Sequence, residues 1–133
     1  MKNLNVVRAV LGGAAALCFI TPLWAKDGNE ALSAVIDQQK KQLPVMLDPM
    51  TRIDNITYAD HTVVYNLTLS GYNGKPGEKT YYTRALTQQI QGSLCMQTAY
   101  LLVLELGNKI TYSYSSSTGE FITSITLSRK DCE

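Results

Sequence analysis

The chain has 133 residues, of which 45% are hydrophobic, and it carries 12 Lys and Arg against 11 Asp and Glu for a formal net charge of +1. This near-neutral balance, without clusters of basic residues, argues against binding to nucleic acid or to an anionic membrane surface. A chain of this length can form one compact domain with a modest hydrophobic core.

The N-terminal segment has the composition of a secretory signal peptide. Two basic residues open the chain, the segment 9–20 is apolar, and Ala25 offers a cleavage site. The apolar segment is too short to span a bilayer as a stable helix. We therefore expect residues 1–25 to be removed on export. Residues 26–133 are then expected to form a single α+β domain that is periplasmic or, alternatively, secreted.

Cys18 leaves a second route open, because a bacterial lipoprotein signal also ends in a cysteine that is acylated. The residue before it is Leu17, whereas the processing enzyme prefers a small residue at that position. We expect a soluble exported protein that meets membranes only indirectly, with lipidation of Cys18 as the alternative.

Residues 26–42 have the pattern of an amphipathic helix. Apolar side chains recur at helical spacing, Glu30 lies in the first turn, and lysines lie in the last turn. Pro44 ends the helix, since the residue before a proline disfavours the helical conformation. Residues 46–50 are expected to form an extended connector.

Two strands follow, joined by a turn at residues 59–61. Residues 51–58 have an apolar pattern that breaks once, which indicates a bulge. Residues 62–70 alternate, and Val64 is the only apolar side chain on their polar face. The apolar face of this second strand carries Val63, Tyr65, Leu67 and Leu69. The glycine-rich segment 71–77 is expected to be a loop.

The segment 79–106 is expected to form two helices or one kinked helix. Thr98 can cap its second part, and Gly107 can end it in the left-handed conformation. Residues 110–115 and 120–128 alternate and form the last strands. The element order α-β-β-α(α)-β-β predicts an α+β sandwich, in which an antiparallel sheet of about four strands packs against helices.

Removal of the signal peptide leaves two cysteines, Cys95 and Cys132. In an oxidising compartment two cysteines pair by default, and only one connectivity exists. We expect this disulfide to stabilise the fold by about 3 to 4 kcal/mol. A metal site completed by His61 is the alternative, although the sequence has no CxxC spacing.

Few residues have the spacing of a catalytic site. His61 is the only histidine and lies in an expected turn, and no GxSxG motif is present. Asp54 and Asp60 could resemble a glycosidase pair only if they met across a hairpin. The loop 71–77 lacks the GK[ST] ending of a phosphate loop. We therefore expect no enzyme, no cofactor and no metal.

Tyrosines and one apolar helix point instead to protein binding. Tyrosine is favoured at interfaces because it combines apolar area with a hydroxyl group, although the same rings can also fill the edge of a core. The segment 99–106 is more apolar than a helix packed on one side requires, so it is either buried or lines a groove for a partner's helix. The candidate partner-binding residues are Leu101, Leu104, Tyr82, Tyr112 and Tyr114.

Several spaced anchors carry a resemblance to a known family. They are Gln42-Leu43-Pro44, the strand VVYNLTLS, Cys95 before the segment LLVLELGNKITYSY, and the closing Cys132. With these anchors the chain resembles the alternative-type pilotins of bacterial type II secretion systems. Such pilotins are α/β sandwich proteins that bind a helical tail of the outer-membrane secretin and escort it to the outer membrane. The resemblance implies a non-catalytic periplasmic protein that chaperones or tethers a secretion-system or envelope component, with a protein partner in the bacterial envelope.

A second hypothesis is a periplasmic inhibitor or immunity protein that neutralises a toxin or hydrolase. Small disulfide-tied α+β proteins suit this task, and the loop 71–77 could plug an active site. Dimer formation through exposed edge strands and a ligand between helix and sheet are both left open by the sequence.

Overall fold

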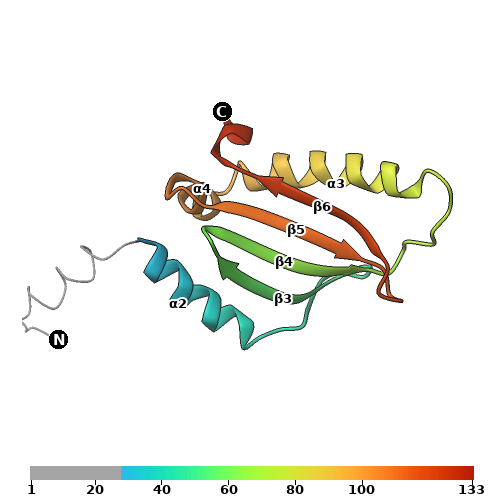
Figure 1. Ribbon diagram of the computed structural model, residues 1–133, viewed down its shortest axis with the longest axis horizontal. Coiled ribbons are helices and arrows are strands. Elements are labelled where there is room, and N and C mark those ends of the chain that lie inside the picture. Colours follow the sequence, from blue (N-terminus) through green and yellow to red (C-terminus); the bar gives the residue numbers. More distant parts are fainter. Residues whose placement is uncertain (1–27) are drawn as a thin grey trace, which may run out of the picture. The chain divides into compact units, whose positions relative to one another are not determined.

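The computed structural model describes residues 28–133 (Figure 1). The expected signal peptide, its cleavage site and Cys18 lie outside the described residues. The first described element is α2 (Gly28–Lys40), and the chain divides into two units within this helix, after Leu32. The described part of the first unit is the start of α2. The second unit, from Ser33 onward, contains the sheet.

The sheet has five strands in the order β2-β3-β4-β5-β6. Their bounds are β2 (Val45–Asp48), β3 (Thr51–Ala59), β4 (Thr62–Leu69), β5 (Lys109–Ser115) and β6 (Phe121–Leu127). Neighbouring strands are antiparallel except β4 and β5, which are parallel. A parallel pair needs a crossover connection. The crossover here consists of two helices, α3 (Glu78–Leu94) and α4 (Thr98–Glu105).

The predicted α+β architecture and its disulfide are confirmed, and the sheet needs two corrections. A fifth strand, β2, lies where we expected a connector at residues 46–50. All four residues of β2 are exposed, so it lacks the alternation by which a half-buried strand is recognised. The sheet is also mixed rather than antiparallel, because the helical crossover returns the chain beside β4.

The centre of the sheet follows the predicted alternation. In β4 the buried side chains are Val63, Tyr65, Leu67 and Leu69, and the intervening ones are half-buried. The predicted break in the preceding strand is confirmed as a register shift between Ile53 and Asn55. Ile110 on β5 and Ile125 on β6 extend the same buried face, because the strand registers place them on it.

The helical crossover consists of two helices, one of the two arrangements expected for the segment 79–106. The N-cap of α4 is Gln97 rather than Thr98, and Gly107 after its end has a φ of +89°, as predicted. Leu94 of α3 and Leu104 of α4 are buried. No helix within residues 28–133 is long and apolar enough to cross a membrane.

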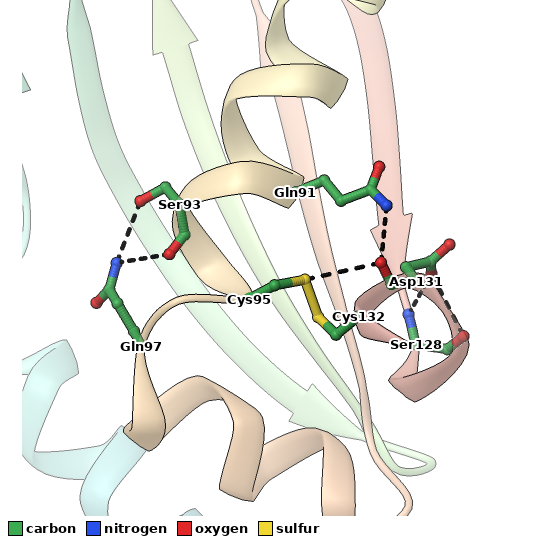
Figure 2. Close-up of a disulfide and its surroundings, with 7 residues drawn as sticks. All are labelled: Gln91, Ser93, Cys95, Gln97, Ser128, Asp131 and Cys132. Atoms are coloured by element: carbon green, nitrogen blue, oxygen red, sulfur yellow. Dashed lines mark hydrogen bonds between the residues drawn. A yellow bond between two sulfur atoms is a disulfide. The ribbon is translucent and has the colours of Figure 1, made fainter.

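The disulfide joins the end of α3 to the end of the described chain. Cys95 is the C-cap residue of α3, and Cys132 ends the short 3-10 helix η1 (Arg129–Cys132), with a Cα–Cα distance of 5.3 Å. The side-chain amide of Gln91 donates a hydrogen bond of 2.7 Å to the carbonyl oxygen of Asp131 (Figure 2). The carboxylate of Asp131 in turn accepts the backbone N–H of Ser128 at 2.7 Å. η1 is therefore held to α3 by a covalent bond and a hydrogen bond.

Candidate functional site

A stack of tyrosines forms on the helix-covered face of the sheet. The parallel register of β4 and β5 places Tyr65 beside Tyr112, and their rings stack with centroids 5.0 Å apart and planes inclined by 8°. Tyr114 lies two residues further along β5. Because successive side chains of a strand alternate between faces, Tyr114 shares the face of Tyr112. Three phenol rings thus cover the middle of the sheet beneath the helices.

A cavity of about 300 Å³ lies between these rings and α3. We call it the tyrosine groove. Its sheet side is lined by Thr51, Ile53, Tyr65, Tyr112 and Tyr114, and its helix side by Leu86, Gln89, Ile90, Ser93 and Leu94. Gln97 and Tyr100 line it from the start of α4, and Leu47 and Asp48 line it from β2. The groove is thus mainly apolar and aromatic, with amide and hydroxyl groups among its lining.

The edge strand β2 adds exposed apolar surface next to the groove. Leu47, which lines the groove, is 57% exposed, and Met46 beside it is 54% exposed. Met46 pairs with Arg52 of β3, whose side chain belongs to the face of the sheet away from the groove. Leu47 and Met46 therefore have similar exposure and opposite orientation.

The tyrosine hydroxyls in the groove are uncharged at neutral pH. Burial is the main cause that raises the pKa of Tyr65 and Tyr112, and the neighbouring Tyr100 raises both further. Tyr100 also shares a side-chain hydrogen bond with Tyr65. Burial, followed by the nearby carboxylate of Asp48, raises the pKa of Tyr114 to about 12. The hydroxyls therefore act as neutral hydrogen-bonding groups on an apolar floor.

Among the described residues that line the groove, Asp48 is the one that carries a charge. One of its carboxylate oxygens accepts the backbone N–H of Met50 at 2.8 Å, which closes the turn between β2 and β3. The carboxylate thus has a structural role at the rim. With a single charge at its edge and apolar or neutral side chains elsewhere, the groove suits an apolar or aromatic group better than a highly charged one.

The residues considered for catalysis do not come together. His61 is exposed in the turn between β3 and β4. Asp54 bonds to Arg52 and to Thr68. Asp60 lies six residues further along the hairpin, which corresponds to about 20 Å of extended chain. Among the described residues, no group of three or more His, Cys, Asp or Glu side chains is arranged to hold a metal ion.

The structure separates the predicted partner-binding residues into three places. Tyr112 and Tyr114 lie in the tyrosine groove. Leu104 is 2% exposed and belongs to the core, and Leu101 is half-buried on the same helix. Tyr82 packs edge-on against Tyr81 and near Tyr72, beside the loop that follows β4.

Sequence reasoning missed the groove residues that come from other elements. Tyr65 was assigned to the buried face of its strand, yet its stacking on Tyr112 depends on the parallel register of β4 and β5. Leu47 was placed in a connector, and Tyr100 was not singled out within its apolar segment. The one sequence feature that pointed to the stack was the presence of tyrosines on the apolar faces of both strands.

Comparisons with known proteins show that the fold of this chain is similar to that of several solved structures. No protein-family model matches the chain, and a search of curated proteins returns no match. Among solved structures, a Pseudomonas aeruginosa protein described as secreted has a TM-score of 0.64 and 17% identity, over 82% of this chain and 99% of that one.

Two pilotins of type II secretion systems are also similar in structure. EpsS of Vibrio vulnificus has a TM-score of 0.63 and 16% identity, over 76% of this chain and 87% of its own. AspS of Vibrio cholerae has a TM-score of 0.59 and 18% identity, over 75% and 87%. The described fold is therefore similar to that of pilotins, as the sequence resemblance suggested.

Proposed function

We propose that this protein is a non-catalytic periplasmic binding protein, which chaperones or tethers a secretion-system or envelope component in the manner of a pilotin. The observation that carries the proposal is the tyrosine groove beside exposed Leu47, on a fold similar to that of two pilotins. In this proposal residues 1–25 direct export and are then removed, and the protein has no catalytic role.

The groove favours a partner segment that is apolar on one side. A helix laid into a groove presents anchors at positions i, i+3, i+4 and i+7. Ile90 and Leu86 on one wall and Leu47 at the rim give such anchors apolar contacts, and Tyr112 and Tyr114 add apolar rings with neutral hydroxyls. Tyr112 and Tyr114 are therefore the main proposed contact residues, with Leu101 and Tyr82 at the periphery.

Burial of Leu104 gives it a supporting role in this proposal. Its side chain is almost completely enclosed, so it would hold α4 in place, and α4 in turn carries Tyr100 to the groove. A variant at Leu104 would therefore alter binding through the fold rather than through direct contact.

The test uses two exposed residues of β2 that point to opposite faces. The helical C-terminal segment of the host's secretin subunit, labelled with a fluorophore, is titrated with wild-type protein and with the variants Leu47→Glu and Met46→Glu. We expect Leu47→Glu to weaken binding about tenfold or more, because it places a charge in an apolar contact. Met46→Glu should bind like wild type.

Equal binding by both variants would contradict a role for the groove. A photo-crosslinking residue at Tyr112, with one at Thr126 on the other face as control, identifies the partner in an envelope extract. Recovery of a secretin or another outer-membrane assembly subunit at Tyr112 supports the proposal, and recovery of a toxin or cell-wall hydrolase there supports the inhibitor hypothesis instead.

A further inference from the structure

A second hollow lies on α3, about 100° around the helix from the residues that line the tyrosine groove. This shallow groove of about 530 Å³ is lined by Lys79, Thr80, Thr83, Arg84, Thr87 and Gln88. Their spacing of three, four and seven residues places them on one side of the helix. We call this surface the β6 trough, for the strand beside which it lies.

Two hydrogen bonds fix the orientation of this side of α3. The hydroxyl of Thr83 donates to that of Thr123 on β6 at 2.8 Å. One helical turn past Thr87, Gln91 donates to the carbonyl oxygen of Asp131 in η1, which follows β6 (Figure 2). Figure 1 shows α3 running beside β6 at one edge of the sheet. The trough therefore lies on the flank of α3 next to β6, and the tyrosine groove lies on an adjoining face of the same helix.

Among the strands within residues 28–133, β6 is at the edge of the sheet and pairs only with β5. An edge strand carries outward N–H and C=O groups that can pair with another extended chain. A chain that added to β6 would lie beside α3, and its alternate side chains would meet the polar side chains that line the trough. Strand addition at a sheet edge beside a helix is an established mode of peptide recognition.

The charge on Arg84 distinguishes between two candidate occupants of the edge of β6, which are a second copy of this chain and a different extended peptide. Lys79 pairs with Glu120 at 3.6 Å, whereas exposed Arg84 forms no ion pair with any described residue. In a dimer paired symmetrically through β6, the two copies of Arg84 would lie close together. The reason is that the neighbouring residue, Thr83, is bonded to Thr123 near the middle of that strand. Like charges so placed repel each other. An acidic side chain on the added strand would instead neutralise Arg84.

We propose that the β6 trough binds an extended peptide segment, which adds as a sixth strand to the edge of β6 and places an acidic side chain against Arg84. This surface shares no lining residue with the tyrosine groove, so in this proposal the protein has two interaction sites on adjoining faces of α3. The proposal does not depend on the partner proposed for the groove.

The probes are two blocked heptapeptides of alternating Val and Thr that differ only in a central Glu or Lys. Binding is followed by the backbone amide shifts of the isotope-labelled protein and by amide hydrogen exchange. We expect the Glu peptide to shift the amides of residues 121–127 and to slow their exchange. The Lys peptide should bind roughly fivefold more weakly, as one partly exposed ion pair allows. N-methylation of the peptide on the side that faces β6 should abolish binding.

Two charge reversals of equal size provide the matched comparison. Arg84→Glu should reverse the preference between the Glu and Lys peptides, while Lys109→Glu, at the start of β5, should leave it unchanged. Leu47→Glu, which alters the tyrosine groove, should also leave peptide binding unchanged.

The proposal is overturned by any of four results. These are shifts confined to the tyrosine groove, equal binding of both peptides to the wild type, no shift at millimolar peptide, and a concentration-dependent dimer through β6 in sedimentation equilibrium.

Discussion

The turn between β3 and β4 contains two residues in an unfavourable backbone conformation. Asp60 has a φ of +52° and His61 a φ of +57°. Two successive positive φ values correspond to a type I′ hairpin turn, in which glycine is strongly favoured at the second position. The left-handed conformation costs a residue with a β-carbon about 1 to 2 kcal/mol. His61, at the second of these positions, is therefore a place where one substitution can raise stability.

We expect His61→Gly to be more stable than His61→Ala by about 1 kcal/mol, since only glycine relieves the backbone. Both variants remove the imidazole, so any interaction of that ring is lost equally and cancels in the comparison. The free energy of unfolding is measured for each in urea. Equal stabilities would show that the backbone conformation is not strained.

The buried tyrosine hydroxyls make stability sensitive to alkaline pH. The folded-state pKa of Tyr114 is about 12, above the ordinary value of 10.0. A raised pKa means that the folded state keeps a proton which the unfolded state releases, so this contribution is complete below pH 10 and is lost as pH rises toward 12. We expect the free energy of unfolding to fall over this range, and to fall less steeply in Tyr114→Phe. Identical slopes in urea titrations at several pH values would contradict the assigned burial of Tyr114.

At the scale of single elements, α4 has one buried face despite an almost wholly apolar sequence. Leu104 is 2% exposed and Leu102, in the same helix, is 59% exposed. Removal of a buried leucine side chain leaves a cavity, whereas removal of an exposed one does not. We expect Leu104→Ala to lower the free energy of unfolding by about 2 to 5 kcal/mol. Leu102→Ala should change it by less than about 1 kcal/mol, as measured by chemical denaturation. Similar losses in both would show that Leu102 is also covered.

Elements with a clear hydrophobic periodicity could be predicted from the sequence. Elements that form only by pairing with another strand could not. The alternation in residues 62–70 identified β4 and its buried face, and Gly107 marked the end of α4, because both depend on local geometry. β2 escaped prediction because its four residues are all exposed and only pairing with β3 makes them a strand. The parallel register of β4 and β5 is likewise a tertiary property, since a helical crossover can return to either side of a strand.

The candidate site was predictable only in part, for the same reason. Tyr112 and Tyr114 were recognisable as neighbours on one strand face, which is a property of the strand alone. Tyr65 joins them through the register of two strands that are far apart in sequence, and Leu47 joins them from an edge strand. The β6 trough had no sequence signal, because it depends on how α3 packs against β6, which is a tertiary property.

For the whole molecule, α3 contributes to two surfaces of different chemistry. The tyrosine groove on one face has an apolar and aromatic lining, and the β6 trough on the adjoining face has hydroxyls and Arg84, which forms no ion pair with any described residue. The disulfide and the bond from Gln91 to Asp131 hold one end of α3 to η1, and Thr83 holds its middle to β6. The placement of α3 therefore affects both surfaces.

The Cys95–Cys132 bond closes a loop with a sequence separation of 37 that contains α4, β5 and β6. Such a loop restricts the unfolded chain, which corresponds to about 3 to 4 kcal/mol of stability. We expect the double variant Cys95→Ser with Cys132→Ser to lose this amount in urea unfolding, and the reduced wild type to match it. A loss below about 1 kcal/mol would mean that the unfolded chain stays compact without the bond.

Because Gln91 and Thr83 still hold α3 in the double variant, its near-ultraviolet tyrosine signal should persist below the unfolding transition. Loss of that signal in the folded range would show that the disulfide positions α3 over the tyrosines as well as restricting the unfolded chain.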